Sequence, residues 1–256
     1  MAAPRGGPGV TRRAAAWGLL GLLGGSVLAA DLLGRQLGLG ALGARPEPGA
    51  PRVALTFDDG PSPFTPDLLD LLARHGTQAT FFLTGERVRR DPHALQAMRD
   101  AGHQLESHGL THRHALTLTP WQEARHVSWH PDPARPGRLY RPPWGGHSPF
   151  TRLLTRLAGA RVALWSAESR DWLPQDGHTL ALDLLRTVRA GDVILLHDGP
   201  DAGRAERTRA LLVTLLPALQ ERGLRPVLLN DLPPGRIGLR DGWRRLHAMW
   251  RAPTSR

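Results

Sequence analysis

The 256-residue chain contains no cysteine and no lysine. Without cysteine it can form no disulfide bond, no thiolate zinc site and no cysteine nucleophile. The absence of lysine excludes Schiff-base chemistry and leaves arginine as the only strongly basic side chain. Any metal site in this chain must therefore be built from histidine and carboxylate side chains.

Acidic residues are few: the chain has 23 of them against 33 basic residues, which gives a net charge of +10. This surplus indicates an anionic partner, which composition alone leaves open between nucleic acid, lipid and cell-wall polymer. The hydrophobic fraction of 41% excludes a wholly disordered chain. The length suits one large domain, or a medium domain with appendages.

Residues 1–30 predict an export segment. Arg5, Arg12 and Arg13 precede an uncharged apolar run over 14–30 that ends in small residues. These are the parts of a secretory signal peptide, and the length of the run also fits a retained membrane anchor, so both interpretations stay open. In either case we expect the rest of the chain to be exported, as a secreted or membrane-anchored extracytoplasmic protein. Without this segment, which carries three Arg and no acidic residue, the net charge falls from +10 to +7.

Two further segments flank the predicted domain, which covers residues 51–232. Residues 31–50 are rich in Gly, Ala, Leu and Pro and predict a flexible linker. Residues 233–256 form a basic tail that contains Trp243 and Trp250. The tail is either a helix packed back on the domain or a contact for a membrane surface or anionic polymer.

Within the domain, short apolar runs alternate with helical patterns. Strands are predicted at 53–57, 79–83, 103–107, 139–140, 161–165, 193–196 and 225–229. Helices are predicted at 66–75, 91–101, from 119 onward, and at 151–158, 179–189 and 206–222. This alternation predicts an α/β fold of parallel strands with helices outside, either a closed barrel or a doubly wound sheet.

Polar residues gather directly after five of these strands. The clusters are Thr56–Pro61, His108–His112, Arg141–Gly145, Asp171–Trp172 and His197–Asp198. Barrels and open α/β sheets place ligand chemistry at the carboxyl ends of their strands. We therefore expect these clusters to form one site.

Two of the clusters suggest a metal site. In an extended segment the neighbours Asp58 and Asp59 point in opposite directions, so one can bind a metal while the other faces a substrate. A simple turn is the alternative, because Asp-Gly-Pro is a common turn sequence. His108 and His112 are four residues apart, which can bring both rings to one side. Two imidazoles and a carboxylate form a common catalytic zinc set.

Other histidines are interpreted by their surroundings. His126 and His130 also lie four residues apart, but no carboxylate cluster at a strand end accompanies them, so we interpret them as a solvated helix face. His197 ends an apolar strand at the expected rim. Beside a metal it is a natural proton donor, and a satisfied core residue is the alternative.

Arginine and tryptophan complete the expected site. Two prolines follow Arg141 and restrict its loop, so its guanidinium suits the orientation of a carboxylate. Trp144 and Trp172 are candidate walls of a sugar-binding groove, with a place in the core as the alternative for each.

Taken together, the ordered motifs resemble the polysaccharide deacetylases of carbohydrate esterase family 4, also called the NodB homology domain. The matches are Thr-Phe-Asp-Asp-Gly-Pro at 56–61, His-x-x-x-His at 108–112, Arg-Pro-Pro-x-Gly at 141–145, Asp-Trp at 171–172 and Leu-x-His at 195–197. Five motifs in order are far more specific than any one of them. The resemblance covers about residues 51–232 and implies a distorted (β/α)7-type barrel, in agreement with the seven predicted strands.

The resemblance also implies catalytic roles. Asp58 would be the general base, positioned by Arg141. His197 would be the general acid, oriented by Asp171. Gly109 departs from the family pattern, which usually has Ser or Thr there to hydrogen-bond the loop.

The same resemblance implies the remaining site residues. Asp59, His108 and His112 would hold a divalent metal, with Zn²⁺ first and Co²⁺, Mn²⁺ or Ni²⁺ as alternatives. The backbone amide of Trp144 would bind the oxyanion. The implied substrate-binding residues are Trp144, Trp172, Leu195 and Pro143.

The expected function is removal of acetyl groups from N-acetylated, or O-acetylated, cell-wall or extracellular polysaccharide. We expect a monomer that binds an N-acetylglucosamine-containing polysaccharide at the cell envelope or membrane surface, and no nucleic acid, which an export signal opposes. An inactive glycan-binding domain is the alternative. Peptidoglycan, chitin-like oligomers, poly-N-acetylglucosamine and acetylated xylan all remain open as substrates.

Overall fold

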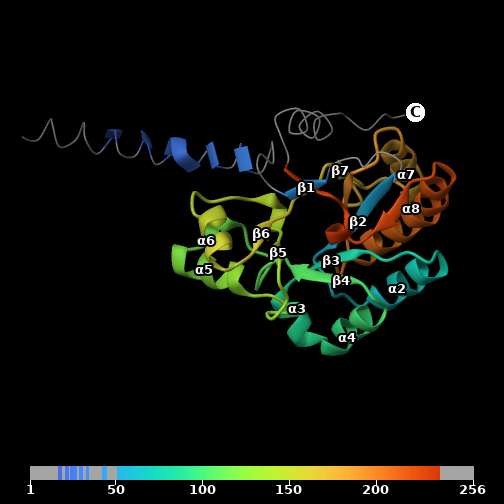
Figure 1. Ribbon diagram of the computed structural model, residues 1–256, viewed down its shortest axis with the longest axis horizontal. Coiled ribbons are helices and arrows are strands. Elements are labelled where there is room, and N and C mark those ends of the chain that lie inside the picture. The colour runs from blue at the N-terminus through green and yellow to red at the C-terminus, as the bar shows by residue number, and fades with distance from the viewer. Residues whose placement is uncertain are drawn as a thin grey trace, which may run out of the picture.

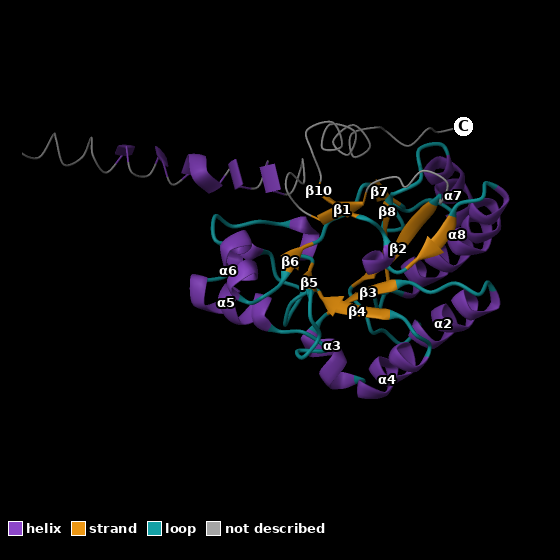
Figure 2. Ribbon diagram, in the orientation of Figure 1, coloured by secondary structure: helices purple, strands orange, loops and turns teal. Residues whose placement is uncertain are grey.

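The computed structural model of the protein describes residues 51–236, together with residues 17–18, 21–22, 24–27, 29–30, 33–34 and 42–44. Its main feature is a curved sheet of parallel strands, which lie around the centre of the domain with helices outside them (Figures 1 and 2). The strands are β2 (Arg52–Asp58), β3 (Thr80–Leu83), β4 (Gln104–Ser107), β5 (Leu139–Tyr140), β6 (Arg161–Val162), β7 (Ala167–Glu168), β8 (Val193–His197) and β9 (Arg225–Val227).

The strand order is that of an incomplete barrel. Hydrogen bonding runs β6-β5-β4-β3-β2-β8-β7, and the described residues show no pairing between β6 and β7 that would close the ring. Strands that follow one another in the sequence are neighbours from β2 to β6 and from β7 to β8, which rules out the doubly wound alternative and confirms the distorted (β/α)7-type barrel.

One predicted strand takes a different place. The run at 225–229 was expected to be the seventh strand of the barrel. Instead, β9 pairs with β2 and lies outside the order of seven strands given above. Leu229 already belongs to a 3₁₀ helix. The seventh strand of the ring is β7, which is only two residues long. Its sequence, Ala-Glu, is not an apolar run from which a strand could be predicted.

Helices cover the outside of the sheet. They are α2 (Thr65–Arg74), α3 (Gly85–Arg90), α4 (Pro92–Asp100), α5 (Pro120–Ser128), α6 (Thr151–Leu157), α7 (Gly177–Leu185) and α8 (Ala202–Glu221). Their starts follow local chemistry: Asp91 and Asp201 accept hydrogen bonds from the first turns of α4 and α8, and Thr119 forms a capping box with Gln122 at α5. The short α3 was not predicted.

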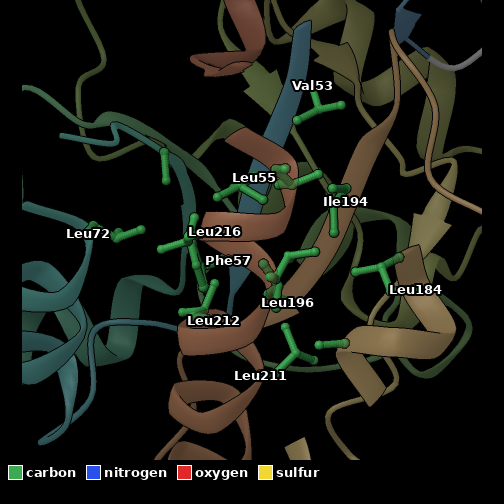
Figure 3. Packing of buried hydrophobic residues seen from close by; sticks show 14 of the residues in the cluster. Val53, Leu55, Phe57, Leu72, Leu184, Ile194, Leu196, Leu211, Leu212 and Leu216 are labelled. Carbon is green, nitrogen blue, oxygen red and sulfur yellow. The ribbon is translucent and has the colours of Figure 1, made fainter. Parts of the chain in front are cut away.

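Alternation along the central strands separates the core from the site. Val53, Leu55 and Phe57 of β2 lie toward the helices in a cluster with Ile194 and Leu196 of β8. Figure 3 shows these side chains packed against leucines of α8. Because strand neighbours point to opposite faces, Thr56 and Asp58, like Leu195 and His197, are directed to the inside of the barrel.

The segments that flank the barrel meet each other. Strand β1 (Leu42–Ala44), within the predicted linker, pairs antiparallel with β10 (Pro234–Arg236) at the start of the predicted tail. Within the part of the chain that the structure describes, none of the helices combines the length and apolar character that crossing a membrane requires. Much of the predicted export segment, and the tail from residue 237 with both of its tryptophans, lies outside the described residues.

Candidate active site

The predicted site residues come together at the carboxyl ends of the barrel strands. Asp58 ends β2 and His197 ends β8, and these two positions are directly paired in the sheet. His108 follows β4, and Arg141 follows β5. The geometry of a parallel sheet thus brings residues that are far apart in sequence to one edge of the barrel.

Asp58 is held by a buried arginine. Arg141 Nη1 donates to Asp58 Oδ1 at 2.7 Å and to the Thr56 hydroxyl at 2.8 Å. The Arg141 side chain has no exposed surface, and its guanidinium lies 3.9 Å from the centroid of the Phe82 ring. Burial raises the pKa of Asp58, although the charge of Arg141 opposes this. One carboxylate oxygen is thereby fixed, while Oδ2 lies on the side of His108, 3.9 Å from its Nε2.

Asp59, His108 and His112 form a group suited to a cation. Asp59 Oδ1 lies 3.1 Å from His112 Nε2 and 3.5 Å from His108 Nε2. One donor atom from each of the three residues lies within 4.8 Å of the others. Asp59 Oδ1 is buried and makes no hydrogen bond to any described residue, which is costly for a carboxylate oxygen unless a cation compensates it.

The two imidazoles are in the state that a metal ligand needs. His108 Nδ1 lies 2.7 Å from the carbonyl oxygen of Arg141, so the N–H belongs there and Nε2 presents its lone pair to Asp59. Burial lowers the pKa of His108 well below its ordinary value and also lowers that of His112. Both rings are therefore neutral near pH 7, and the group fits a divalent cation such as Zn²⁺.

A buried aspartate that sequence reasoning did not assign fixes the turn after β2. Asp198 accepts hydrogen bonds from the hydroxyls of Ser62 and Thr65, both at 2.6 Å, and its N–H donates to the carbonyl of Asp58. Asp59 itself has φ +78°, in the left-handed region that few non-glycine residues adopt. Asp198 thus stabilises the conformation that turns Asp59 toward the histidines.

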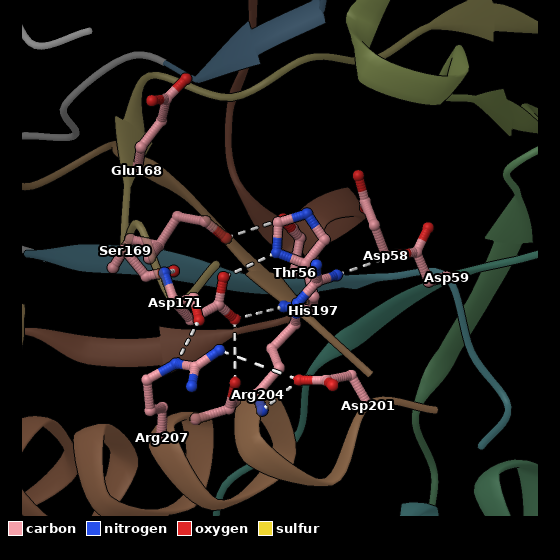
Figure 4. A network of polar contacts seen from close by, with 12 residues as sticks. Thr56, Asp58, Asp59, Glu168, Ser169, Asp171, His197, Asp201, Arg204 and Arg207 are labelled. Atoms are coloured by element: carbon pink, nitrogen blue, oxygen red, sulfur yellow. Dashed lines mark hydrogen bonds and ion pairs between the residues drawn. The ribbon is translucent and has the colours of Figure 1, made fainter. Parts of the chain in front are cut away.

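His197 is held by Asp171 at two points (Figure 4). Asp171 Oδ1 lies 2.7 Å from His197 Nδ1, while Oδ2 accepts from the His197 backbone N–H and from the Thr208 hydroxyl, each at 2.9 Å. Burial alone would lower the pKa of His197, but the Asp171 carboxylate and its hydrogen bond outweigh it and raise this pKa to about 9. The ring is therefore a protonated acid near pH 7, and Nε2 is the atom from which it can donate.

The four predicted substrate-binding residues form one pair with exposed side chains and one pair with buried side chains. Trp144 is 52% exposed, and its ring centroid lies 4.0 Å from that of His112. Trp172 is 38% exposed and meets the His197 ring edge-on at 5.5 Å. One indole thus stands beside the metal group and the other beside the acid. Leu195 and Pro143 are buried.

The interpretation of His126 and His130 as a solvated helix face is wrong. Both side chains are buried, because His126 packs against Gly109 after β4 and His130 against Glu106 within β4. His130 Nε2 lies 2.9 Å from the buried carboxylate of Glu106. Arg204, which sequence reasoning also missed, places Nη1 3.6 Å from Asp59 Oδ2. It reaches the site from the first turn of α8, and no local pattern in the sequence indicates that contact.

Comparisons with known proteins agree with this geometry. The sequence profile of the family described as "Polysaccharide deacetylase" matches residues 45–163. A chitooligosaccharide deacetylase of Sinorhizobium fredii is 35% identical over an alignment of 200 residues that covers 72% of this chain and 92% of the relative. A peptidoglycan-N-acetylglucosamine deacetylase of Bacillus cereus is 31% identical over 70% of this chain and 87% of its own. The structure of a family 4 carbohydrate esterase from Streptomyces lividans, in complex with acetate, superimposes with a TM-score of 0.62 at 28% identity and covers 73% of this chain and 96% of that one.

Proposed function

The chain belongs to the polysaccharide deacetylase family of hydrolases, and from this premise we propose that it removes acetyl groups from N-acetylglucosamine polymers of the cell envelope. One observation carries the proposal: adjacent carboxylates have divided roles. Asp58 is bound to Arg141, while Asp59 faces two neutral imidazoles. A domain that only bound glycans would need neither this division nor the His197–Asp171 pair.

Asp59, His108 and His112 would hold the divalent cation, with Zn²⁺ as the first choice and Co²⁺, Mn²⁺ or Ni²⁺ as alternatives. Two observations support this set: the buried Asp59 Oδ1 without a hydrogen bond, and the His108 tautomer set by the Arg141 carbonyl. A bound cation of this kind lowers the pKa of water toward about 7 and polarises a carbonyl group.

Asp58 is the group that takes the proton of the attacking water. Arg141 occupies Oδ1, so the proton goes to Oδ2, the oxygen on the side of His108. The new C–O bond to the acetyl carbon places negative charge on the former carbonyl oxygen, for which the Trp144 backbone N–H is the proposed donor. A donor of this kind contributes a few kcal/mol, on the order of 3, to the transition state.

His197 completes the reaction on the other side of the site. Its Nδ1 is held by Asp171, so Nε2 gives its proton to the sugar nitrogen while the C–N bond breaks. Acetate and a free amino sugar result. Without this proton the leaving group would be an amide anion, which is too basic to depart.

The substrate class follows from the relatives and from the predicted export of the chain. The two relatives are named for deacetylation of peptidoglycan N-acetylglucosamine and of chitooligosaccharides, so both polymers are proposed. The exposed rings of Trp144 and Trp172 support a sugar chain that runs past the metal group and the acid. Aromatic faces of this kind pack on the apolar faces of sugars.

Acetate release from a panel of polymers tests the proposal. Peptidoglycan, chitooligosaccharides, poly-N-acetylglucosamine and acetylated xylan are incubated with the full-length protein, with and without a chelator. We expect chelator-sensitive release from at least one of the N-acetylated polymers. Binding to these polymers without release from any of them would replace the enzyme by the glycan-binding alternative.

A further inference from the structure

The C-terminal part of α5 lies behind the loop that carries His108 and His112. We propose that His126 is a positioning residue for this loop: its imidazole stands where a side chain at position 109 would be, and so holds the loop in the conformation that binds the metal. The inference rests on the metal site proposed above. It gives a role to a histidine outside the motifs.

The contact between His126 and Gly109 is the main observation. A Cβ atom built on Gly109 would lie 1.9 Å from His126 Nε2, so the imidazole occupies that volume. Gly109 also has φ +88°, where glycine is strongly preferred. The His126 side chain is buried, and its Nε2 has no hydrogen-bond partner among the described residues. The ring therefore meets the loop by packing, one residue after the ligand His108.

A second contact supports the loop from its other side. The N–H of Gly85, at the start of α3, donates to the Gly109 carbonyl at 2.9 Å, and the N–H of Glu86 donates to the Leu110 carbonyl at 2.8 Å. A Cβ atom on Gly85 would lie 2.9 Å from the ring of Trp129, which follows α5 directly. The segment that carries His126 thus also packs against the residue that anchors the loop backbone.

A third contact fixes the strand before the loop. His130 Nε2 lies 2.9 Å from Glu106 Oε2, and the same oxygen accepts from the Leu139 N–H at 2.6 Å. Glu106 stands two residues before His108 in β4. The chain is therefore held on both sides of His108 by three residues of one segment, His126, Trp129 and His130.

The packing matters because ligand geometry is strict. Zn²⁺ requires its nitrogen and oxygen donors at about 2.0–2.2 Å in near-tetrahedral directions. If the imidazole is removed, a void opens beside Gly109, and a glycine with no side chain of its own has the most freedom to move into it. Mutation of a residue that supports the metal ligands from outside the ligand set typically lowers metal affinity by about 10- to 100-fold. Since His126 supplies no atom to the donor group, any effect on affinity must pass through the loop.

Zinc affinity of the full-length protein, measured by competition with a chromophoric chelator, tests the inference. We expect His126→Ala to weaken Zn²⁺ binding at least about 10-fold and to change the visible spectrum of the Co²⁺-loaded protein, which reports ligand geometry. His126→Leu, which fills a similar volume without nitrogen, should stay within about threefold of wild type. His93→Ala removes an exposed histidine of α4 and is the matched control, with no expected change.

A double-mutant cycle identifies the contact itself. Gly109→Ala places a methyl group against the His126 ring and should also weaken zinc binding. In the double variant the collision is gone, so the loss should be smaller than the two single losses combined. The thermal midpoint of each chelator-treated variant is recorded in parallel, because a purely structural role would lower it without changing affinity or the Co²⁺ spectrum.

The outcomes separate the two proposals. Wild-type zinc affinity and an unchanged Co²⁺ spectrum in His126→Ala, additive losses in the cycle, or a loss in His126→Leu as large as in His126→Ala would each overturn the positioning role and leave the metal site standing. If the wild-type protein itself bound no zinc, cobalt, manganese or nickel, the proposed metal site would fail, and the inference with it.

Discussion

The two halves of the candidate site differ in how complete they are before any ligand arrives. The metal half consists of Asp59, His108 and His112. Within it, Asp59 Oδ1 is buried and makes no hydrogen bond to any described residue. In the proton-transfer half, both carboxylates are already paired, Asp58 with Arg141 and Asp171 with His197, each at 2.7 Å. The first half therefore has the geometry of a site that a cation would complete, and the second has its proposed proton donor and acceptor held in place beforehand. Changes in one half should therefore be separable from changes in the other.

The largest difference between the effect on turnover and the effect on zinc affinity is expected when Asp58 is replaced. In Asp58→Asn the side-chain oxygen can still accept the hydrogen bond from Arg141, but the amide cannot take a proton from water. We expect kcat to fall at least about 10³-fold, near the upper range for loss of a general base, with zinc affinity within about threefold of wild type. Acetate release and chelator competition on the same preparation measure the two quantities. A variant that lost zinc as well would show that the halves are not independent.

A smaller loss is expected at Asp171, which touches no reacting atom. Asp171→Asn keeps the shape of the side chain but removes the charge that stabilises the imidazolium and sets the Nδ1 hydrogen bond. We expect kcat to fall about 100-fold, with zinc affinity again unchanged. Thr208→Val serves as the graded control, because it removes only one of the hydrogen bonds to Asp171 Oδ2 and should cost less. Equal losses in both variants would contradict the role of the carboxylate charge.

Metal removal probes the other half. A protein that binds zinc only when folded gains about 2.7 kcal/mol of unfolding free energy at a zinc concentration 100 times the Kd. We expect denaturant unfolding to show this gain for wild type, Asp58→Asn and Asp171→Asn alike. His112→Ala should lose most of the gain, because one of the three donors is removed. If zinc stabilised His112→Ala as much as wild type, the ion would bind at another place.

The sequence predicts the residues of both halves better than the contacts that support them. The ordered motifs predicted that Asp59, His108 and His112 lie together and that both carboxylate pairs form, because strand ends in a parallel barrel converge whatever the loops do. The supporting residues were not predicted. The His126 ring occupies the place of a side chain at position 109, and Asp198 is bound to Ser62 and Thr65 from more than 130 positions away. Such contacts depend on which segments pack together in three dimensions, and a local pattern does not contain them. The two-residue strand β7 was missed for a similar reason, since its neighbour β8 defines it.

The pH dependence of turnover gives the finest distinction between the halves. His197 must be protonated to donate, so activity is lost as the pH rises through its pKa, by tenfold per pH unit once that pKa is passed. Burial lowers this pKa, but the carboxylates of Asp171, Asp59 and Asp58 outweigh it, with Asp171 contributing most, and raise the pKa from 6.5 to about 9 when no cation is bound. A cation at Asp59 repels the imidazolium and so lowers its pKa. The alkaline limb of the plot of kcat against pH should therefore lie between these two values. The acid limb is assigned to Asp58, which must be ionised; burial raises the pKa of Asp58, whereas the charge of Arg141 and of a cation at Asp59 lowers it, so this limb should lie on the acid side of the His197 limb.

The decisive comparison is between wild type and Asp171→Asn, with kcat recorded across the whole pH range. Loss of the carboxylate removes the charge that favours the imidazolium, so the alkaline limb should move to lower pH while the acid limb stays in place. A limb that did not move would assign the alkaline ionisation to a group other than His197, and the water activated in the metal half would then be the group to examine. A shift of the alkaline limb alone would show that the proton-transfer half titrates independently of the metal half.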